Sequence, residues 1–205
     1  MIKPKEKKER SLGERLHLKG DRCLSPKCAS VRKPYRPGAH GKTGRRRSDS
    51  EFGRQIVEKQ KFKVSYGITE KTLKQLFVKA AKSSESTSAK LLELMERRLD
   101  NVVFRLGLAS SRRMARQLII QGHVFVNNKR VKSPGFEVKV KDIVSFRPES
   151  KKLAFVSRLK ESSKNQEIPD WLVLDKEKLE GRILRKPDDL KPPFEVNLLV
   201  ESFSK

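Results

Sequence analysis

The sequence has few of the residues from which active sites and membrane spans are built. It contains 3 histidines, 2 cysteines and 1 tryptophan in 205 residues. No apolar run approaches the ~20 residues of a membrane-spanning helix, and the first residues do not form the apolar centre of a secretory signal. We therefore expect a cytoplasmic protein with no membrane partner, whose cysteines stay reduced or bind metal rather than form a disulfide.

Motifs of the common enzyme classes are also missing. There is no glycine-rich phosphate loop with a lysine, no HExxH and no GxSxG. Cys23 and Cys28 enclose four residues and would supply half of a zinc site, but only His17 and His40 are near them, and a structural site needs four ligands. We expect no catalytic residues, no cofactor and no metal.

Positive charge is what the sequence has in excess. It contains 49 basic and 25 acidic residues, a net charge of +24. Residues 1–47 hold 16 basic and 4 acidic residues, whereas residues 161–205 hold 8 and 10. Self-repulsion of this size opposes compaction unless an anionic partner is present, and a polyphosphate such as RNA fits it best.

The clearest pattern lies in residues 91–146. Apolar residues at spacings of three and four predict a helix over 91–106, which Gly107 ends. The serines at 110–111 offer hydroxyls to the first turn of a second helix, which ends at Gly122. Two helices are therefore expected in close succession.

Arginines line the other face of the second helix. Arg112 and Arg116 lie one turn apart and Arg113 flanks them. No Asp or Glu occurs from residue 110 to residue 122, so ion pairs within the helix cannot neutralise these cations. We expect a fixed cationic ridge that faces RNA, with His123 and Lys129 near its end. His123 has two interpretations, a structural histidine or a phosphate contact, and we favour the contact.

A small sheet is expected after these helices. Short runs at 123–126 and 130–131 are joined by Asn127 and Asn128, which tolerate the left-handed backbone of a tight hairpin. Residues 143–146 are expected to add a third strand.

The flanking regions are less regular. Residues 1–10 are almost wholly charged and are expected to be disordered until they meet an anionic surface. In the proline- and glycine-rich stretch that follows, Tyr35 and His40 lie among cations, and a flat ring there suits stacking on an unpaired base. The alternative is a disordered basic tail. Helices are predicted over 52–62 and from Thr69, and the polar segment 83–88 is a candidate domain boundary.

Several segments of the sequence resemble a known protein family. The segment ERRLDNVVFRLGLASSRRMARQLIIQGHVFVNNKRV closely resembles the RNA-binding module of the fourth protein of the bacterial small ribosomal subunit, a module also found in some pseudouridine synthases and tyrosyl-tRNA synthetases. LKGDRCLSPKCASVRKPYRPGAHG, EFGRQIVEKQKFKVSYGITEKTL, PDWLVLDKEKLEGRILRKPDD and NLLVESFSK resemble the ribosomal protein in the same order. The resemblance covers nearly the whole chain.

The resemblance implies an α+β fold in which the RNA-binding module is inserted within a mainly helical domain. We expect a basic extended N-terminal segment at 1–47, a helical domain at 48–90 that residues from about 187 to 205 complete, the module at 91–158 and a strand or linker region packed on it at 159–186. The functional residues implied by position are the RNA contacts Arg98, Arg112, Arg113, Arg116, His123, Lys129, Tyr35, Arg36, His40, Arg45, Arg46 and Arg47. Asp100 is expected to orient an arginine rather than act on a substrate.

The function implied is that of a structural protein of the small subunit, present once per subunit. It would be a primary binder of 16S rRNA that nucleates assembly of the subunit body. With the fifth and twelfth small-subunit proteins it would influence translational accuracy, contacting the fifth and lying near the mRNA entry path. The alternatives are an RNA-modifying enzyme of the pseudouridine synthase kind and an RNA-binding repressor that acts off the ribosome.

Two positions depart from the family pattern. Zinc-binding members have two further cysteines upstream of the pair matching Cys23 and Cys28, and Glu6 and Glu9 stand there in this sequence. The turn usually built with Pro-Gly before the last strand of the module reads Val-Lys at 140–141.

Overall fold

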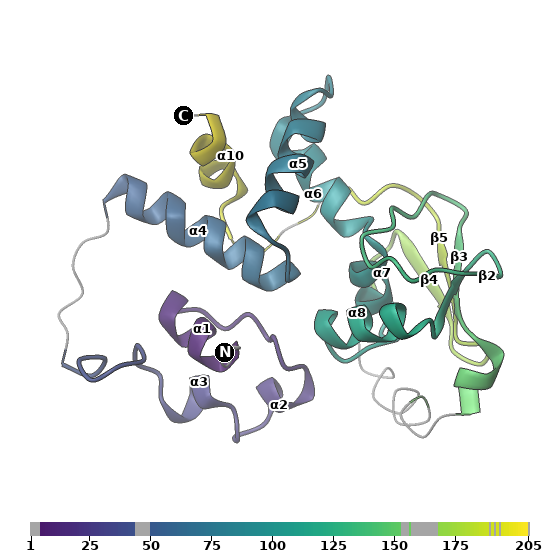
Figure 1. Cartoon of the computed structure of the whole chain (residues 1–205), viewed down its shortest axis with the longest axis horizontal. Helices are drawn as coiled ribbons and strands as arrows, with labels where there is room; N and C mark the ends of the chain where they lie inside the picture. Colours follow the sequence, from purple (N-terminus) through teal and green to yellow (C-terminus); the bar gives the residue numbers. More distant parts are fainter. Residues whose placement is uncertain are drawn as a thin grey trace. The chain divides into compact units, whose positions relative to one another are not determined.

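The computed structural model describes residues 5–43, 50–152, 156, 168–188, 190, 192 and 194–204. The chain divides into two compact units: unit 1 comprises residues 1–88 with 191–205, and unit 2 comprises residues 89–190 (Figure 1). Helices and an antiparallel sheet are both present, so the predicted α+β class is confirmed. Among the described residues, no helix combines the length and the apolar character needed to cross a bilayer.

Three longer helices form the centre of unit 1. They are α4 (Glu51–Tyr66), α5 (Glu70–Ala81) and the C-terminal α10 (Val196–Ser204), which packs against α4 and also contacts α5 (Figure 1). The Phe62 ring packs on the rings of Tyr66 and Phe194, with centroids 4.9 and 5.2 Å away. The apolar C-terminal end therefore packs against a helix far from it in sequence.

Polar caps fix where α4 and α5 begin. The Ser50 hydroxyl accepts a hydrogen bond from the Gly53 amide, and the Thr69 hydroxyl accepts one from the Thr72 amide. Each cap satisfies one of the amides that the first turn of a helix leaves without an internal partner. The predicted start at Thr69 is confirmed, and the helix predicted over 52–62 extends to Tyr66.

The N-terminal residues differ from the expected disordered and extended segment. They form three short helices, α1 (Lys5–Leu12), α2 (Asp21–Leu24) and α3 (Ala29–Arg32), and α1 packs against α3 and α4. Glu6 and Glu9 of α1 are buried. The sequence has no apolar period here because the order comes from polar contacts between residues far apart in the chain.

Unit 2 begins with two helices where one was predicted. The helix expected over 91–106 is α6 (Thr87–Glu96) followed by α7 (Leu99–Arg105). The helix is interrupted at 97–98 because the backbone there pairs with a later segment. Arg98 forms a bridge with Glu137, and the Val138 amide donates to the Arg97 carbonyl. The apolar spacing continues across the break, and for that reason the pattern alone suggested one helix.

The second predicted helix is α8 (Arg112–Gln121), and Gly122 ends it in the left-handed conformation, as expected. A hairpin follows, made of β1 (Val124–Val126) and β2 (Lys129–Arg130), with positive φ angles at Asn127 and Asn128. The predicted hairpin is confirmed because both asparagines adopt the backbone that its turn requires.

The sheet has five strands in the order β2-β1-β3-β5-β4. The strand predicted at 143–146 is β3 (Ile143–Phe146), and β4 (Leu172–Asp175) and β5 (Glu180–Ile183) extend the same sheet in antiparallel register. A 3-10 helix, η1 (Pro148–Lys152), follows β3. Gly181 lies so close to α7 that a Cβ there would be 2.3 Å from a methyl carbon of Leu106.

The apolar core of unit 2 joins α7 and α8 to the inner face of this sheet. Leu106, Ile119, Val144 and Trp171 are among its buried members. The core therefore holds α8 as a rigid element on the sheet.

The turn that departs from the family pattern is formed with Lys141 at a φ of 74°, the conformation that glycine adopts at least cost.

Candidate nucleic-acid interface

The start of α8 positions its arginines. The Ser111 hydroxyl accepts a hydrogen bond from the Met114 amide at 3.3 Å, so the helix begins directly before the arginines. Arg113 is exposed, and Arg112 and Arg116 are half-buried. The opposite face, with Ala115, Leu118 and Ile119, is buried in the core. The three guanidiniums are thus carried by a helix whose orientation is set by packing.

Two neutral groups help to hold Arg112 in place. Its Nε donates to the Asn101 Oδ1 at 2.7 Å, and its guanidinium lies over the Phe104 ring, 4.7 Å from the centroid. A cation over an aromatic face is attracted by the ring without losing its charge. These contacts fix the side chain while leaving it positive.

Asn101 is itself held in place by the carboxylate of Glu96. Its Nδ2 donates to Glu96 Oε2 at 2.6 Å, and the same carboxylate accepts two hydrogen bonds from Arg105 at 2.9 and 3.0 Å. Glu96 is 1 % exposed. One carboxylate thus serves two arginines, directly for Arg105 and through an amide for Arg112, and the four-residue network keeps one positive charge in excess.

Acidic side chains elsewhere on α6 and α7 are also engaged. Glu93 accepts hydrogen bonds from Lys90 and Arg97. Burial by itself would raise the pKa of Glu93, but these two cations outweigh it and lower the pKa from its ordinary value. The charge of this carboxylate is therefore balanced locally, away from the arginines of α8.

Arg98 differs from the other predicted RNA contacts because it is buried. It is 6 % exposed, and its guanidinium donates twice to Asp100, at 3.1 and 2.8 Å. A guanidinium paired at two points in this way is already engaged within the fold. The expectation that Asp100 orients an arginine is confirmed, and this arginine lies close to Gly135. Its contact with RNA stays a prediction.

His123 and the hairpin lie at the far end of α8. The His123 Nδ1 is 2.9 Å from the hydroxyl of Ser150, a buried residue of η1, and this contact agrees with the structural interpretation of His123. Lys129 is exposed on β2. Its neighbour Arg130 donates to the Gln121 carbonyl at 3.3 Å and covers Gly122, where a Cβ would be 2.2 Å from its Nε.

A second cationic group surrounds Tyr35 in unit 1. The Arg10 guanidinium and the Lys42 ammonium lie 5.0 and 5.2 Å from the centre of the Tyr35 ring, and Arg10 Nε donates to the Tyr35 carbonyl at 3.1 Å. Arg36 and His40 are exposed. Two cations therefore lie over the Tyr35 ring, in agreement with its basic sequence context.

The loop after Tyr35 closes tightly. A Cβ at Gly41 would lie 1.8 Å from the Arg36 carbonyl oxygen, so only glycine fits there. The predicted contacts Arg45, Arg46 and Arg47 lie outside the described residues. The remaining predicted residues therefore fall into two sets, one on each unit.

Sequence reasoning missed the residues that support these cations. Arg112 is supported by Asn101 and Phe104 directly and by Glu96 through Asn101. The Tyr35 ring is contacted by the cations of Arg10 and Lys42. Glu96 and Asn101 are five residues apart and meet across the interruption between α6 and α7. Their contact could have been predicted only if that interruption had been predicted. The second group is brought together by contacts over 25 and 7 residues, which no local pattern reveals.

Comparison with known proteins identifies the family. Residues 1–96 match the family described as ribosomal protein S4/S9 N-terminal domain, and residues 97–144 match the S4 domain. Proteins called small ribosomal subunit protein uS4 are similar over 195 residues, which is 94 % of this chain and 93 % of each relative: 43 % identical in Thermoanaerobacter sp. (strain X514), 43 % in Thermus thermophilus and 45 % in Syntrophomonas wolfei. Because both family matches and the full-length relatives agree with the cationic α8 and its module, the chain belongs to the uS4 family of small ribosomal subunit proteins.

Proposed function

We propose that this chain is a primary binder of 16S rRNA that nucleates assembly of the body of the small ribosomal subunit. As a uS4 family member it is a ribosome-associated protein of the cytoplasm and not an enzyme, as the sequence predicted. The observation that carries the finer proposal is the rigid arginine face of α8, where Arg112 is pre-set by neutral contacts.

The proposed contacts form two surfaces. On unit 2 they are Arg112, Arg113, Arg116, His123 and Lys129. On unit 1 they are Tyr35 with its cations, Arg36, His40 and the arginines at 45–47. Phosphate contacts from the arginines would fix the position of the RNA, and flat groups would stack on unpaired bases. A pre-ordered cation loses less conformational entropy on binding than a mobile one.

We also propose the partners of this chain within the small subunit. The chain would occur once per subunit, contact the fifth small-subunit protein, influence accuracy together with the fifth and twelfth, and lie near the mRNA entry path. An RNA-modifying enzyme is not favoured, because residues 1–144 are matched by the two ribosomal and S4 families and the catalytic motifs sought in the sequence do not occur.

Substitution of the arginine face tests the proposal. Replacing Arg112, Arg113 and Arg116 together with Ala is expected to weaken binding of 16S rRNA in a filter-binding titration by one to several orders of magnitude at moderate salt. The logarithmic salt slope should fall by about 2 to 3, since each lost phosphate contact removes about 0.7 to 0.9. The emission of Trp171, the single tryptophan and a buried residue of unit 2, verifies that the variant is folded.

Arg185→Ala is the matched control. Its side chain is 56 % exposed and pairs with Asp188, in a stretch where acids balance the bases. Affinity should stay close to that of the native chain. Equal affinity of the triple variant and the native chain would exclude the α8 face as an RNA contact. Sedimentation of the native chain apart from small subunits and their precursors would favour the off-ribosome repressor.

A further inference from the structure

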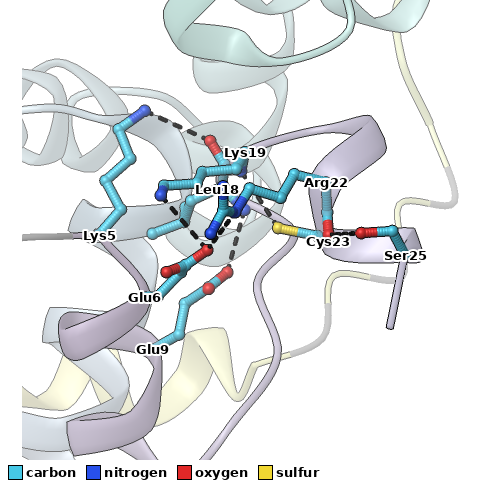
Figure 2. A network of polar contacts seen from close by, with 8 residues as sticks. All are labelled: Lys5, Glu6, Glu9, Leu18, Lys19, Arg22, Cys23 and Ser25. Atoms are coloured by element: carbon cyan, nitrogen blue, oxygen red, sulfur yellow. Dashed lines mark hydrogen bonds and ion pairs between the residues drawn. The ribbon is translucent and has the colours of Figure 1, made fainter. Parts of the chain in front are cut away.

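Four residues of unit 1 stand where the zinc-binding relatives implied by the resemblance have four cysteines. They are Glu6, Glu9, Cys23 and Cys28, and all are buried, with exposed fractions of 9, 1, 2 and 1 %. Figure 2 draws the surroundings of Glu6, Glu9 and Cys23, which decide whether this set suits a metal. A closed zinc site needs four donors that are deprotonated and turned toward one point.

Glu6 is already engaged by two cations. Its Oε1 lies 3.3 Å from the Lys19 ammonium and 3.1 Å from Arg22 Nε, as the dashed lines of Figure 2 show. A zinc ion bound to this carboxylate would lie beside two positive side chains. Because the same carboxylate oxygen already pairs with both cations, a metal bound there would have to displace them.

Glu9 and Cys23 are engaged by backbone amides. Glu9 Oε1 accepts from the Leu18 amide at 3.0 Å, and Cys23 Sγ accepts from the Lys19 amide at 3.3 Å (Figure 2). Both side chains therefore already accept hydrogen bonds from the backbone of residues 18–19.

The donor set does not fit a structural zinc ion. Within the part of the chain that the structure describes, no three His, Cys, Asp or Glu side chains gather as metal ligands would. Glu6 and Glu9 instead share a structural role, because they lie one turn apart on α1 and together hold the segment from Leu18 to Arg22.

We propose that an ion-pair network holds the N-terminal helices in this chain and takes the place of a metal. The network comprises Glu6 and Glu9 of α1 with Leu18, Lys19 and Arg22, and it is completed by Lys5, whose ammonium donates to the Leu18 carbonyl at 3.3 Å. Each of the two carboxylates joins α1 to chain that lies 9 to 16 residues further on. Folding of these helices is then independent of zinc and of chelators.

The network also supports the Tyr35 group. Arg10, which lies over the Tyr35 ring, belongs to the same helix as Glu6 and Glu9. The carboxylates bind the segment from Leu18 to Arg22, and Arg10, directly after Glu9, donates to the Tyr35 carbonyl. Loss of the network should therefore also loosen the loop that carries Arg36 and His40.

Metal content and stability of the native full-length chain test the proposal directly. The protein is dialysed against zinc, then against buffer without zinc, and its zinc is measured by mass spectrometry. Thermal unfolding is followed by circular dichroism with added zinc and with EDTA. The expected result is no stoichiometric zinc and the same unfolding midpoint in both. Retention of about one zinc per chain, or a midpoint that EDTA lowers, would overturn the proposal.

A double variant shows that the assay detects a metal site. Glu6→Cys with Glu9→Cys restores four thiols and removes the carboxylates that the cations prefer. Zinc uptake by this variant but not by the native chain supports the proposal, and equal uptake by both overturns it.

Arg22→Gln separates the network from a metal site by the sign of its effect. The ion-pair network predicts a lower unfolding midpoint, because Glu6 keeps only Lys19. A metal site predicts unchanged or tighter zinc binding, because one repelling cation has gone. Arg32→Gln on α3, where the arginine is exposed, is the matched control and should leave the midpoint unchanged. An Arg22→Gln chain as stable as the control would contradict the network.

Discussion

Unit 2 and the N-terminal part of unit 1 are ordered by different forces. In unit 2, apolar side chains of α7, α8 and the sheet form one continuous core. In residues 5–43, the buried apolar side chains are Leu16, Cys23 and Cys28, and the carboxylates Glu6 and Glu9 are buried beside them. The first region folds by burying hydrocarbon, and the second by pairing charges across short helices.

This difference has a functional side. Burial of apolar area does not depend on the direction of individual contacts. The buried face of α8 can therefore hold the helix on the core while the side chains of its outer face remain charged. Ion pairs are directional and consume charge: Lys19 and Arg22 are committed to Glu6. Unit 2 can therefore offer RNA a rigid cationic face, whereas the N-terminal helices use part of their charge for their own fold.

The largest effect is expected where unit 2 buries a charge as well. Asp100→Ala leaves the Arg98 guanidinium unpaired in a site where the two side chains are 8 and 5 % exposed. Breaking a buried pair on one side costs about 3 to 5 kcal/mol. Urea unfolding followed by Trp171 emission, which reports on unit 2 alone, should show a loss of this size.

Glu137→Ala is the control for Asp100→Ala. Glu137 pairs with Arg97 at 3.2 Å, but its side chain is 37 % exposed, so the loss should be within about 1 kcal/mol. Similar losses for the two variants would show that burial does not set the strength of ion pairs in unit 2.

A smaller effect is expected at Glu93, because its partners Lys90 and Arg97 keep side-chain exposures of 18 and 15 %. Since the folded-state pKa of Glu93 lies below its ordinary value, the carboxylate stabilises the fold above pH 4.5 and loses this effect as the pH falls through the folded-state pKa. Glu93→Gln should therefore flatten the acid side of the stability profile recorded by Trp171 emission.

Glu70 offers the counterpart in unit 1. Burial would raise its pKa, but Lys59 and Lys63 lower it overall, so the pH dependence has the same sign. Its side chain is 48 % exposed, and solvent screening weakens the pairs. Glu70→Gln should change the acid-side stability less than Glu93→Gln, as measured by circular dichroism. A larger change at Glu70 would contradict the expectation that the more buried carboxylate forms the stronger pairs.

The same contrast explains which parts of the fold were predictable. Periodic apolar residues identified α4, α5, α8, β1 and β3. Thr69 marked the start of α5, Ser111 and Gly122 marked the ends of α8, and two asparagines marked the hairpin turn. Local sequence determines these features, because a cap or a turn depends on its own few residues. The arginines of α8 were placed on the outer face for the same reason.

The misses arise from contacts over longer distances. The break between α6 and α7 depends on backbone hydrogen bonds with residues 134–138, and the burial of Arg98 depends on the loop at Gly135. The helices of residues 5–43 depend on Glu6 and Glu9 meeting residues 18–22. A sequence pattern records the spacing of residues along the chain, and it contains no signal for polar partners that only the fold brings together.

The smallest effect is expected at the helix caps, where Ser111 also separates stability from RNA binding. Ser111→Ala should cost about 1 kcal/mol in the Trp171 transition, because the Met114 amide loses its partner. Ser50→Ala on α4 should cost less than that, since Ser50 is exposed and water can replace its hydroxyl at the Gly53 amide. Ser111→Asp keeps a cap of similar strength but adds a carboxylate directly before Arg112. That variant should remain as stable as the native chain and bind 16S rRNA more weakly in a filter-binding titration, an outcome that a purely structural α8 would not produce.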